Sequence, residues 1–139
     1  MDIKFKEDFI VLWKRFFGEA ELPIAFYYTD EEGHAELVNP DTIRRCIFPA
    51  LSLVGKGRAL CFDAESIGCS GGQWCLGFRE TLEPDAEYSV SSGIPGKVEG
   101  ERYKKTPEIA AEWVKLLPSF KAPAKFIVFK RWDSLNESD

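Results

Sequence analysis

The chain has 139 residues, the usual length of one domain, with 45% hydrophobic and 29% charged residues, as in an ordinary soluble globular protein. Its formal net charge of −5, from 18 basic and 23 acidic side chains, argues against a protein that follows nucleic-acid phosphates through a basic stripe. No apolar run approaches the roughly 20 residues that cross a bilayer, and the N-terminus has no apolar secretory core. We therefore expect one cytoplasmic domain over residues 1–139, without nucleic-acid or membrane partners.

The first part of the chain predicts a helix and a hairpin. Apolar residues recur at helical spacing from Phe5 to Phe17, and Gly18 is a suitable stop. We expect this stripe to pack on the core, with a partner-binding face as the alternative. A strand is predicted over residues 24–29, a turn over 30–33, and the return strand of the hairpin over 34–38.

A second helix is predicted beyond this hairpin. Asp41 or Thr42 is suited to cap it, and the helical pattern runs toward Leu53. Pro49 lies inside the pattern, so we expect the helix to kink or to end early. Residues 58–63 are short and apolar, which predicts a strand.

The middle of the sequence is rich in glycine and loop residues. A glycine-rich loop is expected over residues 67–72, followed by a helix over 73–78. Residues 80–100 are rich in Pro, Gly, Ser and acids, which predicts an irregular connecting segment with one short strand near residues 88–90.

The last part of the chain contains a clear helix start. Thr106 can cap a helix with Pro107 at its first position, and Pro118 ends it. A final strand is predicted over residues 126–132. We interpret the basic residues near this strand as a solvated strand edge: Lys121, Lys125, Lys130 and Arg131. Together these elements predict an α+β fold, with a mixed or antiparallel sheet and about three to four helices packed on it.

All four cysteines lie within thirty residues: Cys46, Cys61, Cys69 and Cys75. Their spacing contains no CxxC pair and fits neither zinc-ribbon, thioredoxin nor common ferredoxin signatures. Four thiolates could still meet in space, so a zinc or iron–sulfur site stays open. For Cys61, Cys75 and Cys46 we favour the interpretation that each packs as a small apolar residue.

Cys69 differs because Ser70, Gly71 and Gly72 follow it before a predicted helix. Backbone N–H groups at a helix N-terminus attract anions and stabilise a thiolate, and glycines let a ligand approach the backbone. Cys69 is therefore the candidate catalytic thiol. A loop without a functional role is about equally compatible with this sequence. His34 is the one histidine and is expected at the surface beside the hairpin turn, so a protease-like Cys/His pair is not expected.

Several segments in order resemble a known family. They are the helix with Cys46, Ala50 and Gly57, then Cys69–Gly72, Leu76–Phe78, Ser92–Gly96, Glu99–Tyr103 and Phe126–Lys130. This order is similar to family 169 of domains of unknown function, an archaeal conserved region, over roughly residues 22–135. The resemblance brings no established activity. It implies that Cys46 and Cys69 are the recurring cysteines. It also implies a short or truncated member, because members usually continue further.

Three functions remain open at this point. The first is a binding module for a small anionic or acyl ligand or a cofactor, with Ser70, Gly71, Gly72 and Trp74 as the ligand-binding residues. The second is a thiol-dependent or redox enzyme that uses Cys69 with Cys46 or Cys75. The third is an iron–sulfur or zinc protein, with Cys46 and Cys69 among its metal ligands. The cofactor is otherwise unknown, and a homo-oligomer or a structural role at a subunit interface is also open.

Overall fold

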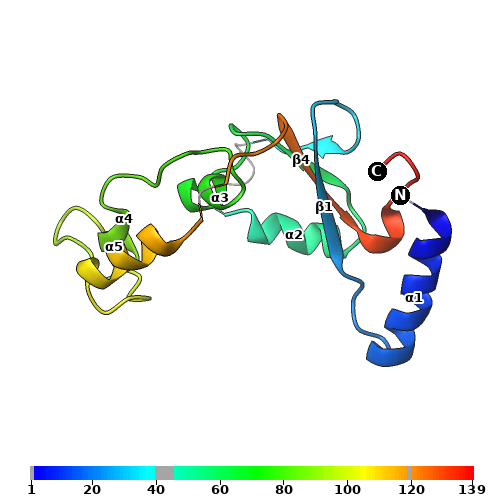
Figure 1. The fold of residues 1–139 in the computed structure, drawn as a ribbon, viewed down its shortest axis with the longest axis horizontal. Helices are drawn as coiled ribbons and strands as arrows, with labels where there is room; N and C mark the ends of the chain where they lie inside the picture. The colour runs from blue at the N-terminus through cyan, green and yellow to red at the C-terminus, as the bar shows by residue number, and fades with distance from the viewer. Residues whose placement is uncertain (1, 40–45, 119) are drawn as a thin grey trace. The chain divides into compact units, whose positions relative to one another are not determined.

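In the computed structural model of this protein, which describes residues 2–39, 46–118 and 120–139, the chain forms two units. The first contains Met1–Gln73 and Ala122–Asp139, and the second contains Trp74–Lys121. The expected α+β class is confirmed, because the described residues form five α-helices and a four-stranded mixed sheet (Figure 1). The single domain expected over residues 1–139 stays a prediction.

The sheet belongs to the first unit and has the strand order β1-β4-β3-β2. Its strands are β1 (Ile24–Thr29), β2 (Glu36–Leu37), β3 (Leu60–Phe62) and β4 (Phe126–Arg131). β4 pairs antiparallel with both β1 and β3, whereas β2 pairs parallel with β3 (Figure 1). The strands predicted at 24–29, 58–63 and 126–132 are confirmed.

The predicted hairpin is wrong, because β1 pairs with β4 and not with the segment that follows it. The physical reason lies in the burial of β4. Its first four residues, Phe126, Ile127, Val128 and Phe129, are each at most 5% exposed. A strand that is apolar on both faces is stable only in the centre of a sheet, so it takes the position beside β1.

One face of the sheet is covered by α2 (Phe48–Gly55), which contacts β4 and β1 (Figure 1). Ala50 and Val54 are its buried residues. Pro49 lies in the first turn of α2, where a missing N–H group costs nothing, so the expected kink or early end is wrong. The predicted caps Asp41 and Thr42 lie outside the described residues.

The opposite face of the sheet contains Cys61, Phe126 and Val128, with Tyr27 and Ala35 packed against them. The interpretation of Cys61 as a core residue is confirmed, since it is only 5% exposed. Lys130 lies on the same face of β4, two residues beyond Val128, and is 4% exposed. The interpretation of Lys130 as part of a solvated strand edge is therefore wrong, because β4 is central.

The N-terminal helix α1 (Ile3–Phe17) begins and ends near the predicted residues. The carboxylate of Asp2 accepts a hydrogen bond from the backbone N–H of Lys4, and Gly18 follows the helix with a φ of 61°. α1 packs on η1 (Trp132–Ser134), where the Phe9 and Trp132 ring centroids are 4.4 Å apart. The expected packing of α1 on the core is seen only in part, because α1 contacts η1 but none of its residues is buried.

The second unit contains α4 (Ala86–Ser89) and α5 (Pro107–Leu116), which contact one another. The short strand predicted near residues 88–90 is wrong, because this segment belongs to α4 and its last turn. The start of α5 is as predicted: the Thr106 hydroxyl accepts a hydrogen bond from the backbone N–H of Ile109. Among the described helices, none is long and apolar enough to cross a membrane.

A close backbone crossing organises the segment after α4. A Cβ atom on Gly100 would lie 2.3 Å from the backbone nitrogen of Gly93 and 2.5 Å from the carbonyl oxygen of Ser91. Only glycine fits at this distance. The backbone N–H of Arg102 donates to the Ser91 carbonyl, and that of Glu101 donates to the Ser89 carbonyl. The glycines of this segment therefore serve its own folding.

Candidate functional site

The Cys69 loop leads directly into α3 (Ser70–Cys75), a helix that begins three residues earlier than predicted. The sulfur of Cys69 accepts a hydrogen bond from the backbone N–H of Gly72 at 3.2 Å. The carbonyl of Cys69 accepts another from the backbone N–H of Gln73 at 2.9 Å. Cys69 is therefore the N-terminal cap of α3, and it already uses two of the N–H groups that were expected to attract an anion.

The two glycines of this loop differ in their surroundings. A Cβ atom on Gly72 would lie 2.8 Å from the Cys69 sulfur, 3.2 Å from a methyl carbon of Ile47 and 3.3 Å from one of Ile67. A Cβ atom on Gly71 would meet nothing within 4 Å. A Cβ atom on Gly72 would thus force the Cys69 sulfur to move, whereas the space beside Gly71 is open. The predicted roles of Ser70, Gly71, Gly72 and Trp74 in ligand binding stay predictions.

The four cysteines differ in burial. Cys46 and Cys69 are half-buried, Cys61 is buried, and Cys75 is exposed, so the interpretation of Cys75 as a packed apolar residue is wrong. Burial raises the pKa of the Cys61 thiol to about 11, and the nearby carboxylates of Asp63 and Glu32 act in the same direction. Within the part of the chain that the structure describes, no three His, Cys, Asp or Glu side chains are grouped to hold a metal ion.

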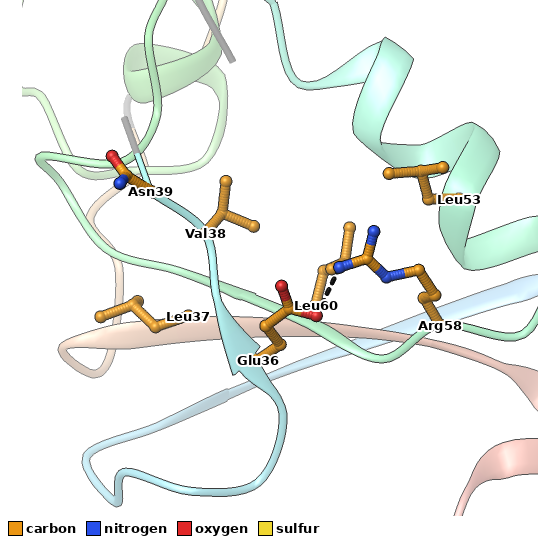
Figure 2. A pocket seen from close by; sticks show the side chains of 7 residues that line it. All are labelled: Glu36, Leu37, Val38, Asn39, Leu53, Arg58 and Leu60. Atoms are coloured by element: carbon orange, nitrogen blue, oxygen red, sulfur yellow. Dashed lines mark hydrogen bonds and ion pairs between the residues drawn. The ribbon is translucent and has the colours of Figure 1, made fainter. Parts of the chain in front are cut away.

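A pocket of about 310 Å³ lies in the first unit, at the edge of the sheet formed by β2 and β3. Figure 2 shows its lining side chains: Glu36, Leu37, Val38, Asn39, Leu53, Arg58 and Leu60. Four of these are apolar, and the Arg58 guanidinium and Glu36 carboxylate point toward one another as an ion pair (Figure 2). The pocket thus combines an apolar wall with one cation.

The backbone explains why Arg58 lies at this pocket. The chain leaves α2 through Gly57, whose φ of 95° suits a residue without a Cβ atom. The backbone N–H of Arg58 then donates to the Leu53 carbonyl, which ties it to the end of α2. On the other wall, the N–H of Val38 donates to the Cys61 carbonyl and extends the pairing of β2 with β3. The sequence pattern did not indicate this pocket, because the pairing that creates it joins distant segments.

A buried polar cluster lies on the other face of the sheet. The Lys130 ammonium donates to both carboxylate oxygens of Asp139, and the Tyr27 hydroxyl donates to one of them at 2.6 Å. His34 Nδ1 lies 3.2 Å from the same hydroxyl, and its Nε2 lies 3.0 Å from Glu31. The expectation of His34 as a surface residue holds only in part, because its side chain is 19% exposed.

The buried polar cluster shifts the pKa of its carboxylic acid, Asp139. Burial alone would raise the pKa of Asp139, but hydrogen bonds from Lys130, Tyr27 and the Asn136 backbone lower it to about 2. Burial and the neighbouring Asp139 carboxylate raise the pKa of Tyr27. Lys130 alternates with the apolar Phe126 and Val128 on one strand face, but this pattern buries it only because β4 is a central strand.

Comparison with known proteins identifies a family. The model of family 169 of domains of unknown function, described as an uncharacterised ArCR, matches residues 15–138. No curated protein and no solved structure matches this chain. The match covers nearly all of the two units and begins near the end of α1. The chain therefore belongs to family 169 of domains of unknown function, as the order of its motifs indicated.

Proposed function

We propose that this protein binds a small molecule with a carboxylate group in the pocket between α2 and the β2–β3 edge of the sheet, with Arg58 as the anchor of that carboxylate. The observation that supports the proposal is the combination of a cation with apolar walls in a pocket of about 310 Å³. Ligand pockets are typically a few hundred Å³, mostly apolar, with a few polar groups that orient the ligand.

Arg58 is suited to this role by its geometry. A guanidinium presents several N–H groups in one plane and binds a carboxylate through two parallel hydrogen bonds. Among the described residues, its ion-pair partner is Glu36, and the two side chains are 48% and 62% exposed. Ion pairs at such exposed positions contribute little free energy, so a ligand carboxylate can replace Glu36 at small cost.

The apolar walls of the pocket determine which chemical group can be attached to the carboxylate of the ligand. Leu60 and Val38 are 2% and 6% exposed, and Leu53 faces them from α2. Their side chains offer hydrocarbon surface next to the cation. The preferred ligand is therefore a carboxylate with a short apolar chain. The sequence predicted a ligand of this chemistry at the Cys69–Gly72 loop, whereas this proposal places it beside Arg58.

The test uses hexanoate as the anionic probe and hexylammonium as its cationic counterpart. Each is titrated into the isotope-labelled full chain, and amide resonances are followed by NMR. We expect hexanoate to shift the amides of Val38, Leu53 and Arg58 with saturation, and hexylammonium to shift none of them. The proposal is overturned if hexanoate produces no saturable shift at these positions.

Two variants sharpen this test. Arg58→Met keeps the length of the side chain and removes its charge, so we expect hexanoate binding to weaken roughly 2- to 5-fold, the loss for one ion pair at an exposed position. Arg79→Met is the matched control, because Arg79 also forms an exposed ion pair, with Glu83 in the second unit. Equal losses in both variants would show binding that does not depend on the pocket.

A second candidate function is thiol chemistry at Cys69. It is favoured by the hydrogen bond from the Gly72 N–H to the Cys69 sulfur, a contact that also stabilises a thiolate. Cys46, the recurring family cysteine, is its proposed partner, and metal binding by this pair is the remaining form of the same proposal. The rate of iodoacetamide labelling of Cys69 against pH tests it. A Cys69 that titrates near the ordinary 8.5 contradicts an activated thiol.

A further inference from the structure

The exposed side of α1 carries large apolar side chains that the other described residues cover only in part, with Phe5 packed edge-on against Trp132 at 6.1 Å between ring centroids. Phe5, Leu12 and Phe16 are 57%, 50% and 71% exposed. With Phe9 they repeat at spacings of four, three and four residues, which is the heptad pattern of a coiled coil. Within this heptad pattern, Phe9 is the member that packs on Trp132 of the same chain, and Trp13 stacks against Phe9. The open side of the stripe is therefore available to a second helix.

We propose that α1 pairs antiparallel with α1 of a second copy of this chain, through Phe5, Leu12 and Phe16, to form a two-fold symmetric dimer. The charged residues beside the stripe indicate that the partner helix is α1 of a second copy. Asp8 and Arg15 lie seven residues apart, so they occupy the same heptad position on one flank of the stripe. In an antiparallel pair, equal flanks face one another, and Asp8 then meets Arg15 of the second copy twice by symmetry.

Charge also argues against a membrane surface as the occupant. Helices that lie on anionic membranes carry mainly Lys and Arg on their polar face. The charged residues of α1 are four basic and two acidic side chains, with Glu7 and Asp8 between Lys6 and Lys14, and the whole chain has a net charge of −5. A surface of mixed charge fits a self-complementary protein partner better than a bilayer.

The position of α1 in the chain supports a role separate from ligand binding. The family model begins at residue 15, so most of α1 precedes the matched region. α1 packs on η1, and Lys6 donates hydrogen bonds to the carbonyls of Asp133 and Leu135. Its stripe is thus held in place on the first unit without being buried by it.

The experiment is sedimentation equilibrium of the full chain at several concentrations, with charge-reversal variants. Asp8→Arg and Arg15→Asp each place like charges in contact twice, so each is expected to raise the dimer dissociation constant roughly tenfold. The double variant Asp8→Arg/Arg15→Asp restores opposite charges and is expected to recover the affinity of the parent. Glu7→Arg is the matched control, because Glu7 lies away from the stripe, and it should leave the affinity unchanged.

Two further measurements decide the alternatives. Leu12→Glu places a charge in the centre of the stripe and is expected to give a monomer whose helix content by circular dichroism equals that of the parent. Flotation with phosphatidylserine-containing vesicles should leave the protein unbound. The proposal is overturned if the parent is monomeric at 0.2 mM, on the order of the weakest specific dimers. Loss of affinity in the double variant, or vesicle binding that Leu12→Glu abolishes, also overturns it.

Discussion

The Lys130 ammonium lies 2.7 Å and 2.8 Å from the two carboxylate oxygens of Asp139, and their side chains are 5% and 1% exposed. This ion pair joins the central strand β4 to the segment that follows η1. The Tyr27 hydroxyl completes the coordination of the carboxylate from β1. One buried carboxylate thus ties the end of the chain to β4, nine residues earlier, and to β1, which is distant in the sequence.

Removing one partner of this pair should strongly destabilise the protein. Asp139→Asn leaves the buried Lys130 ammonium without its counter-charge. Lys130→Met leaves the buried Asp139 carboxylate without its counter-charge. Each should lower the free energy of unfolding by about 3–5 kcal/mol, whereas Lys130→Met/Asp139→Asn should cost much less than the sum. Urea unfolding of the four proteins measures this. Lys125→Met, at the exposed pair with Glu32, is the control that should change little. Additive losses would contradict the coupling.

The same pair predicts how stability depends on pH. The pKa of Asp139 is lowered to about 2 in the folded protein, below the ordinary value of about 3.9 in the unfolded chain. The stabilisation is therefore fully present above about pH 5, and it is lost as the pH falls toward 2. It corresponds to about 2 kcal/mol. The difference in urea midpoint between the parent and Asp139→Asn should shrink between pH 5 and pH 2. If the difference in urea midpoint stays constant between pH 5 and pH 2, the lowered pKa of Asp139 does not cause the pH dependence of stability.

The sequence predicted where helices and strands lie more reliably than which strands pair with one another, and the reason is physical. Local periodicity determines whether a segment suits a helix or a strand, so α1, β1, β4 and α5 were predicted near their observed bounds. Pairing depends on how much of each strand is buried, which only the whole chain decides. β2 therefore lies beside β3 and not β1. The burial of Lys130 escaped prediction for the same reason, since only a central strand buries a lysine at that position.

The rate at which iodoacetamide modifies each cysteine should depend on how deeply its thiol is buried. Cys61 is 5% exposed, and its raised pKa of about 11 disfavours the thiolate at neutral pH. Cys75 is exposed. At pH 8, iodoacetamide should modify Cys75 within minutes and Cys61 only in urea, as mass spectrometry of proteolytic peptides will show. Rapid modification of Cys61 in the folded protein would place it outside the core.

The candidate site could be predicted only in part. The order Cys69-Ser70-Gly71-Gly72 indicated a helix near this cysteine, but the predicted bounds of 73–78 were wrong, because Ser70, Gly71 and Gly72 belong to α3 and the helix ends at Cys75. It could not indicate that the Cys69 sulfur itself accepts the Gly72 N–H, because that depends on the rotamer of one side chain. The Arg58 pocket gave no sequence signal, since its walls come from α2, β2 and β3.

Gly71 and Gly72 provide a matched pair of substitutions within one helix. Gly72→Ala places a methyl group 2.8 Å from the Cys69 sulfur and against Ile47 and Ile67, so we expect a loss of about 1–3 kcal/mol in the free energy of unfolding. Gly71→Ala meets nothing within 4 Å, and alanine favours a helix by up to about 1 kcal/mol, so this variant should be as stable as the parent or more so. Thermal and urea unfolding of both variants measure the contrast.

A second substitution tests whether the sulfur is the cause of the Gly72 constraint. Cys69→Ser replaces the sulfur with a smaller oxygen on a shorter bond, and serine is itself a favourable N-terminal cap. Cys69→Ser/Gly72→Ala should therefore recover part of the stability lost in Gly72→Ala, whereas Cys69→Ser combined with Gly71→Ala should show no such recovery. If Gly71→Ala and Gly72→Ala are equally stable, the packing of Gly72 against Cys69 does not limit this helix, and the loop is open to a ligand at both glycines.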